Sequence, residues 1–190
     1  MFTKEQINNY VAASYKIACE HGFHDEEKSN AHWMMLVVSE IGEMVEADRK
    51  NRRVKMKKDN LDNALRSNDF ASTYEFWVKG TLEEETADVC IRLFDFLGMK
   101  GIEPDVFDEK KDDWRIMFSK LSICEQCYEL VQCITAIYND TDVNEIAMYA
   151  GAALLFCFDF AEEHGFDLEY HIEQKMKYNE SREKLHGKNY

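Results

Sequence analysis

The stretch "WMMLVVSEIGEMVEAD", residues 33–48, combines the pattern of a core helix with a regular row of acids. At ~100° per residue, its apolar side chains share one wide arc, and Glu40 and Glu43 stand about 60° apart at the edge of that arc. Two carboxylates ~4 Å apart repel each other by about 4 kcal/mol at an effective dielectric of ~20. The stretch therefore predicts a buried helix whose acids need a cation, which is a Lys, an Arg or a metal ion.

The composition indicates one all-α domain. The chain has 190 residues, 45% of them hydrophobic, and only one proline. Its apolar residues recur at spacings of three and four, which is typical of helices. We expect helices at residues 3–20, 30–50, 81–98 or 81–101, from Pro104 onward, and at 119–138, 142–164 and 167–186, with short helical pieces in an excursion at 51–80.

The net charge of −14 argues against nucleic acid as a partner, because a broad acidic field repels it. A small polyanion can still enter if divalent metal and a few local cations offset that charge. The start, "MFTKEQINNY", does not have the pattern of a leader, and no apolar run is expected to reach membrane-spanning length. We therefore expect a cytoplasmic protein with no membrane partner.

A second helix repeats the arrangement of the first. In "LEEETADVCIRLFDFLG", residues 82–98, Glu85 and Asp88 border an apolar arc. If the two helices pack antiparallel, four carboxylates converge on a small volume. Such an all-oxygen cage suits hard Mg²⁺, and also Mn²⁺. The expected metal ligands are Glu40, Glu43, Glu85 and Asp88.

Two other interpretations stay open. The acids could be solvated helix edges, with Arg92 pairing with Asp88 and Asp95, in a non-catalytic helical partner or regulatory module. A carboxylate-bridged redox metal bundle is the third class, but it needs two ExxH motifs on core helices. Only one ExxH occurs, at Glu183 and His186.

Three motifs in order carry a resemblance to a known family. An ExxE helix (Glu40, Glu43) precedes an ExxD helix (Glu85, Asp88), and the tail "KMKYNESREKLHGKNY" contains K-x-x-x-N-x-x-R. From about Ser29 onward the chain resembles the MazG-like all-α nucleoside triphosphate pyrophosphohydrolases, which are related to dimeric dUTPases and dCTP pyrophosphatases. One departure is the 41 residues between Glu43 and Glu85, a gap longer than is usual in that family.

The resemblance implies Mg²⁺-dependent hydrolysis of a (deoxy)nucleoside triphosphate to the monophosphate and pyrophosphate, in a helical bundle of the all-α NTP pyrophosphatase type. The implied partner is the triphosphate, and a homodimer is compatible with the family. The four acids would hold the metal, and Glu43 would also orient the attacking water. The candidate substrate-binding residues are Lys79, Arg92, Lys175, Asn179 and Arg182 for the phosphates, and Trp33 for the base.

A weak internal repeat suggests a duplicated helix pair within this single domain, residues 1–190. Shifting the chain by 64 residues aligns "DFLGMKGIEPDVFDEK" with "DFAEEHGFDLEYHIEQ". Residues 1–118 would then be the metal-binding half, and 119–190 a degenerate half that contributes a substrate-facing tail. With this shift Tyr149 and Ala152 replace Glu85 and Asp88, and with a different offset Gln132 replaces Glu43, so we expect no metal in the second half.

Overall fold

The computed structural model describes residues 3–104, 120–139 and 141–187, and within these ranges the chain forms helices and no strands. The all-α prediction is confirmed. The helices are α1 (Lys4–Glu20), α2 (Asn30–Arg49), α3 (Lys58–Ser67), α4 (Phe70–Trp77), α5 (Leu82–Lys100), α7 (Ile123–Thr135), α8 (Val143–His164) and α9 (Leu168–Glu180), followed by the short 3-10 helix η1 (Lys184–Gly187).

Most helix ends lie where local sequence signals predict them. Thr3 caps α1 in a reciprocal capping box with Gln6, and Ser29 caps α2 by accepting a bond from the backbone of His32. Such side-chain caps satisfy amide groups that the first turn leaves without partners. At the other end of α5, Gly101 adopts the left-handed conformation (φ 65°) that suits glycine.

Three predicted boundaries are wrong. The helix expected from Ser119 to Tyr138 is shorter, because Ser122 forms a capping box with Glu125 and α7 ends at Thr135. Ser119 and the helix expected beyond Pro104 lie outside the described residues. The last helix, expected to fade near His186, ends at Glu180 and is followed by a turn.

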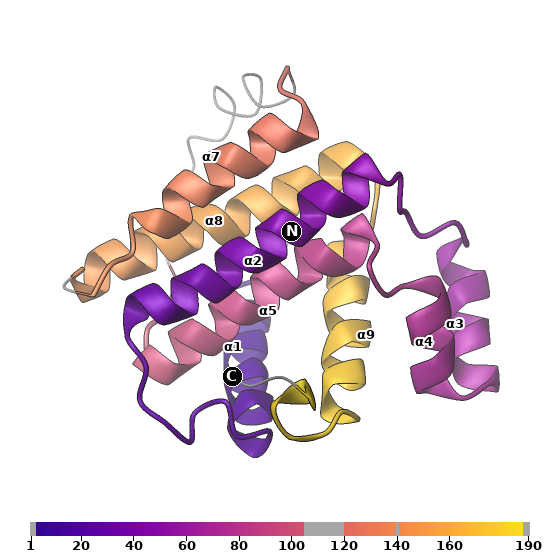
Figure 1. Ribbon diagram of the computed structural model, residues 1–190, viewed down its shortest axis with the longest axis horizontal. Helices are drawn as coiled ribbons and strands as arrows, with labels where there is room; N and C mark the ends of the chain where they lie inside the picture. The colour runs from indigo at the N-terminus through magenta and orange to yellow at the C-terminus, as the bar shows by residue number, and fades with distance from the viewer. Residues whose placement is uncertain (1–2, 105–119, 140, 188–190) are drawn as a thin grey trace.

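Helix α5 is the centre of the molecule and contacts α1, α2, α8 and α9 (Figure 1). Thirteen of its nineteen residues are buried. It runs antiparallel to α2, as expected, since its first residue, Leu82, donates a backbone bond (3.1 Å) to Arg52, just beyond the end of α2. The ExxE and ExxD motifs therefore lie on adjacent helices.

Helices α7 and α8 cover one side of this pair, with α7 against α2 and α8 against α5 (Figure 1). This arrangement is compatible with a duplicated helix pair, which stays a prediction. The expectation that no run reaches membrane-spanning length is wrong for α8, whose 22 residues are long and apolar enough by composition. A core helix passes the same test, and here Leu154, Cys157 and Phe160 of α8 belong to the hydrophobic core.

The segment between α2 and α5 forms a small outlying unit. As expected, it contains short helical pieces, α3 and α4, which pack against each other beside α9 (Figure 1). Their apolar faces meet α9 in a separate cluster that includes Leu61, Tyr74 and Tyr178. The rings of Tyr74 and Tyr178 stack with centroids 4.6 Å apart. This contact holds α9 beside the start of α5.

Candidate metal centre

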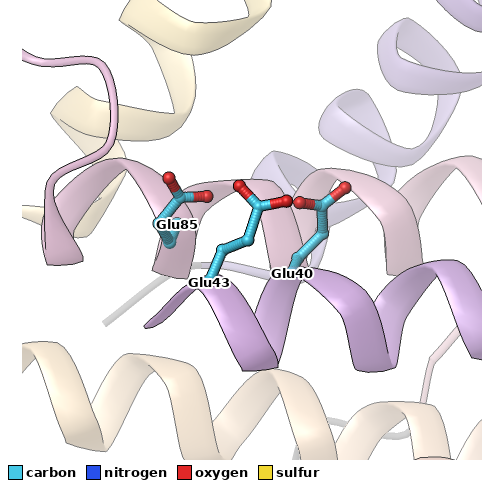
Figure 2. A group of neighbouring side chains, drawn as sticks. All are labelled: Glu40, Glu43 and Glu85. Atoms are coloured by element: carbon cyan, nitrogen blue, oxygen red, sulfur yellow. The ribbon is translucent and has the colours of Figure 1, made fainter. Parts of the chain in front are cut away.

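Three glutamates from the two predicted motifs converge. Figure 2 shows Glu40 and Glu43 on α2 beside Glu85 on α5, and one carboxylate oxygen of each lies within 4.8 Å of the other two. Ligand oxygens at ~2.1 Å from an octahedral Mg²⁺ are about 3 Å apart when adjacent and about 4 Å when opposite. The three carboxylates therefore fit a hard divalent ion after a small inward movement of the side chains.

The environment of Glu85 favours the neutral form of its carboxyl group. Its side chain is buried, and this desolvation, together with the nearby charges of Asp88, Glu84 and Glu43, raises its pKa from 4.5 to about 9. Burial disfavours the charged form and like charges add to the effect. A cation placed among these oxygens would offset the repulsion between the carboxylates and favour their ionised forms.

Arg92 supplies one cation to the cluster. Its Nε donates to Glu40 Oε1 at 3.0 Å, and both side chains are largely shielded from water. The alternative interpretation paired Arg92 with Asp88 and Asp95, whereas the structure gives it Glu40. The guanidinium also lies over the ring of Phe23, with 5.6 Å between its carbon and the ring centroid. These contacts fix Arg92 at the edge of the three glutamates.

Asp88 is not part of the three-glutamate group, because Lys175 of α9 engages it. Lys175 Nζ lies 2.6 Å from Asp88 and 2.5 Å from Glu84. Burial of Lys175 opposes its charge, but Asp88 and Glu84 outweigh that effect and raise its pKa. Lys175 is therefore held as a cation inside the molecule. The assignment of Asp88 as a metal ligand stays a prediction.

Glu84 is the main residue of the site that sequence reasoning missed. Thr81 caps the start of α5, but the Glu84 carboxylate turns inward. It accepts bonds from Lys175, from the hydroxyl of Tyr74 and from the backbone of Gly80. The spacing of four between Glu84 and Asp88 was the available signal, since it places both on one helix face.

The residues predicted to bind phosphates share one cavity with these acids. The cavity has a volume of about 120 Å³, and we call it the central cavity. Lys79, Arg92, Lys175, Asn179 and Arg182 all line it together with Glu40, Glu43, Glu85 and Asp88. The structure thus brings together five of the six candidate substrate-binding residues. The sixth, Trp33, is not among the lining residues; it lies in the core, 4% exposed, with its ring 4.8 Å from that of His24.

Asn179 and Arg182 differ in the hydrogen bonds that their side chains make. The side-chain oxygen of Asn179 is buried without a hydrogen-bond partner in the part of the chain that the structure describes. The guanidinium of Arg182 donates to the backbone oxygen of His186 at 2.9 Å. An orphaned buried acceptor costs stability unless a donor reaches it, so the Asn179 oxygen is able to accept a bond from a water or from a donor group of a ligand.

The end of the central cavity near α1 has a different character, which the sequence did not reveal. Ile17 and Phe23 give it an apolar wall. Asp95 lies there too, and its Oδ1 is 2.7 Å from Nε2 of His24. Burial raises the pKa of Asp95, against the opposing effect of His24. The cavity therefore has an ionic end at the glutamates and a partly apolar end at α1.

No protein-family model, curated protein or solved structure matches this chain.

Proposed function

We propose that the protein hydrolyses a (deoxy)nucleoside triphosphate to the monophosphate and pyrophosphate, with Mg²⁺ or Mn²⁺. One observation carries the proposal: three glutamate carboxylates from two motifs converge beside a row of cations in a single cavity. The acids suit a divalent ion, and the cations suit the phosphates that such an ion cannot neutralise alone. The resemblance in the ExxE, ExxD and tail motifs supports the same reaction.

The carboxylates would hold the metal ion, and one of them would also orient the attacking water. Glu40, Glu43 and Glu85, with Asp88 as the fourth candidate, would hold the ion, which when bound polarises a phosphoryl oxygen and makes a water more acidic. Glu43 is the carboxylate that we assign to orienting the attacking water, because it is the exposed member of the group. The water oxygen bonds to the α-phosphorus, the α–β bridging bond breaks, and pyrophosphate leaves with that bridging oxygen.

The cations act on the leaving group. Arg182 and Lys79 line the same cavity as the glutamates and would bind the β- and γ-phosphates, to which the side-chain NH2 group of Asn179 would also donate. Lys175 is paired with Glu84 and Asp88, which largely offset its charge, so it would contribute less to phosphate binding. Charge-assisted bonds are stronger than neutral ones, so Arg182 and Lys79 would hold the triphosphate in place.

A panel of nucleoside and deoxynucleoside triphosphates, incubated with Mg²⁺, Mn²⁺ or EDTA, tests the proposal. We expect at least one substrate to yield its monophosphate and pyrophosphate with metal and none with EDTA. Glu43→Gln should lower turnover at least 100-fold while the chain remains helical. Glu46→Gln is the matched control, because Glu46 follows on the same helix but pairs with Lys50 outside the cavity. Release of inorganic phosphate instead of pyrophosphate, or full turnover by Glu43→Gln, would refute the assignment.

A further inference from the structure

A second hollow, distinct from the central cavity, lies between residues 50–55 and the end of α4. It has a volume of about 600 Å³, and we call it the basic cleft. Four cations from one short segment, Lys50, Arg52, Arg53 and Lys55, line it, and Lys79 closes one side. Among the described residues that line it, Glu75 is the only acid. In a chain of net charge −14, this local excess of positive charge is the opposite of the average.

Several of these cations are available to a ligand. Lys50 pairs with Glu46 and Lys79 with Glu75. Within residues 3–104, 120–139 and 141–187, no acid lies within ion-pair distance of Arg52, Arg53 or Lys55. A Cβ built on Gly80, which has a φ of 73°, would come within 2.8 Å of Nη1 of Arg52. The Arg52 guanidinium therefore lies beside the backbone of Gly80.

Aromatic rings complete the basic cleft. Phe76 is 76% exposed and Trp77 is 37% exposed, and their rings meet edge to face with centroids 4.8 Å apart. Both side chains line the cleft and give it an aromatic wall. A planar base stacks on such a ring, and adjacent guanidinium groups bind phosphate oxygens in pairs.

We propose that the basic cleft is a second nucleotide-binding site, which takes a nucleoside di- or triphosphate without a metal ion. Its cations would bind the phosphates, and the Phe76–Trp77 pair would stack the base. A mononucleotide fits better than a nucleic acid, because a long strand leaving the cleft would meet the acidic remainder of the surface.

The proposal goes beyond the proposed hydrolysis and does not depend on it. The two hollows are nevertheless linked, because Lys79 lines both. An anion in the basic cleft competes for Lys79, which otherwise serves the central cavity. Binding at the two sites would therefore be coupled, and the coupling would be reciprocal.

Calorimetric titration with ADP in EDTA separates the two sites. Without a divalent ion the glutamates of the central cavity repel phosphates, whereas the basic cleft needs no metal. We expect one ADP to bind in EDTA, equally well to Glu43→Gln. Arg52→Gln with Arg53→Gln should raise the Kd at least tenfold. Arg49→Gln with Lys57→Gln is the matched control and should stay within twofold, because it removes two exposed charges that flank the cleft without lining it.

A spectroscopic readout tests the stacking. Binding of ADP should quench tryptophan fluorescence, and Trp77→Phe should remove that quenching while ADP still binds. Four outcomes would overturn the proposal: no binding of ADP in EDTA, equal loss in the control pair, pyrophosphate binding as tightly as ADP, or a ten-nucleotide single strand binding more tightly than ADP. Thermal melts of both double variants confirm that they remain folded. Since Glu43→Gln keeps the cleft, failure of the hydrolysis proposal would leave this result unaffected.

Discussion

Glu85 links the protonation of the site to the stability of the fold. In the folded, metal-free chain its pKa is about 9, against 4.5 for an ordinary glutamate. Between these two values the folded chain keeps a proton on Glu85 that the unfolded chain has released. Stability falls with rising pH wherever the folded state binds more protons, by up to about 1.4 kcal/mol per pH unit for one group. Glu85 therefore contributes stability below pH 4.5 that is progressively lost as the pH rises toward 9.

Glu85→Gln should remove this contribution. In EDTA we expect the free energy of unfolding of the wild-type chain to fall more steeply from pH 5.5 to pH 8 than that of Glu85→Gln, whose amide does not titrate. Urea unfolding at several pH values measures the difference. Glu46→Gln is the control, because Lys50 lowers the pKa of Glu46, so Glu46 stays ionised in both the folded and the unfolded chain over this pH range. Identical pH slopes for wild type and Glu85→Gln would show that Glu85 is not protonated in the folded chain.

Arg182 is expected to bind substrate rather than to act in the chemical step. Its guanidinium lines the central cavity and is held by His186. Arg182→Ala should therefore raise KM for the triphosphate about tenfold and change kcat little, which is the pattern of lost uniform binding. Lys184→Ala, which removes a nearby cation paired with Asp25, should leave KM unchanged. A loss confined to kcat would contradict the assignment.

At the scale of helices, two glycines in helix interiors give a matched test of the packing of α1 on α5. A Cβ on Gly98 would come within 2.5 Å of the Tyr15 Cβ and 3.0 Å of the backbone oxygen of Val11, whereas a Cβ on Gly42 would meet nothing within 4 Å. Alanine is favoured over glycine in helices by about 1 kcal/mol. Gly42→Ala should therefore stabilise by 0.5–1 kcal/mol, and Gly98→Ala should destabilise by about 1–3 kcal/mol.

Chemical unfolding of the two variants measures this difference directly. Stabilisation by Gly98→Ala would mean that α1 is free to move away from α5. The contact matters for the site, because the partly apolar end of the central cavity is formed by Ile17 of α1.

Helix ends could be predicted where a capping residue acts on the adjacent turn. The site could be predicted where its residues share one face of a helix. The caps at Thr3 and Ser29 act within one turn, so the sequence around them is sufficient. The convergence of Glu40 and Glu43 with Glu85 required only an antiparallel pair of helices. Glu84 could not be distinguished from Glu85 in this way, because its inward direction depends on Lys175, 91 residues away.

At the scale of the whole molecule, metal binding should stabilise the fold. A ligand at 100 times its Kd adds about 2.7 kcal/mol to the free energy of unfolding. We expect Mg²⁺ or Mn²⁺ to raise the Tm relative to EDTA, and the combined change of Glu40, Glu43 and Glu85 to glutamine to abolish that rise. Thermal melts with EDTA, Mg²⁺, Mn²⁺ and Fe²⁺ make the comparison. No response to any metal would favour a helical partner module, and a coloured iron complex in air would favour a redox bundle.

The position of α9 is a property of the whole chain that helical periodicity could not supply. Its Lys175 and Asn179 line the central cavity, and α9 packs on α5 while Tyr178 stacks on Tyr74 of the outlying unit. The periodicity of each segment predicts which face is apolar, but not which distant face it meets. The basic cleft was missed for the same reason: the basic run was visible at 50–55, whereas Phe76 and Trp77 join it only through folding.

The placement of Lys175 also sets an order of assembly. Helices α2 and α5 can pair as soon as both have been made, which brings the glutamates together beside Arg92. Closing the gap from Glu84 to Lys175 joins residues 91 positions apart, and loops of that length close slowly and at an entropic cost. During synthesis, Glu84 and Asp88 therefore lack the Lys175 cation until α9 has been made. A chain truncated before Lys175 would leave Glu84 and Asp88 without their cation, and would expose an incomplete core to chaperones and proteases.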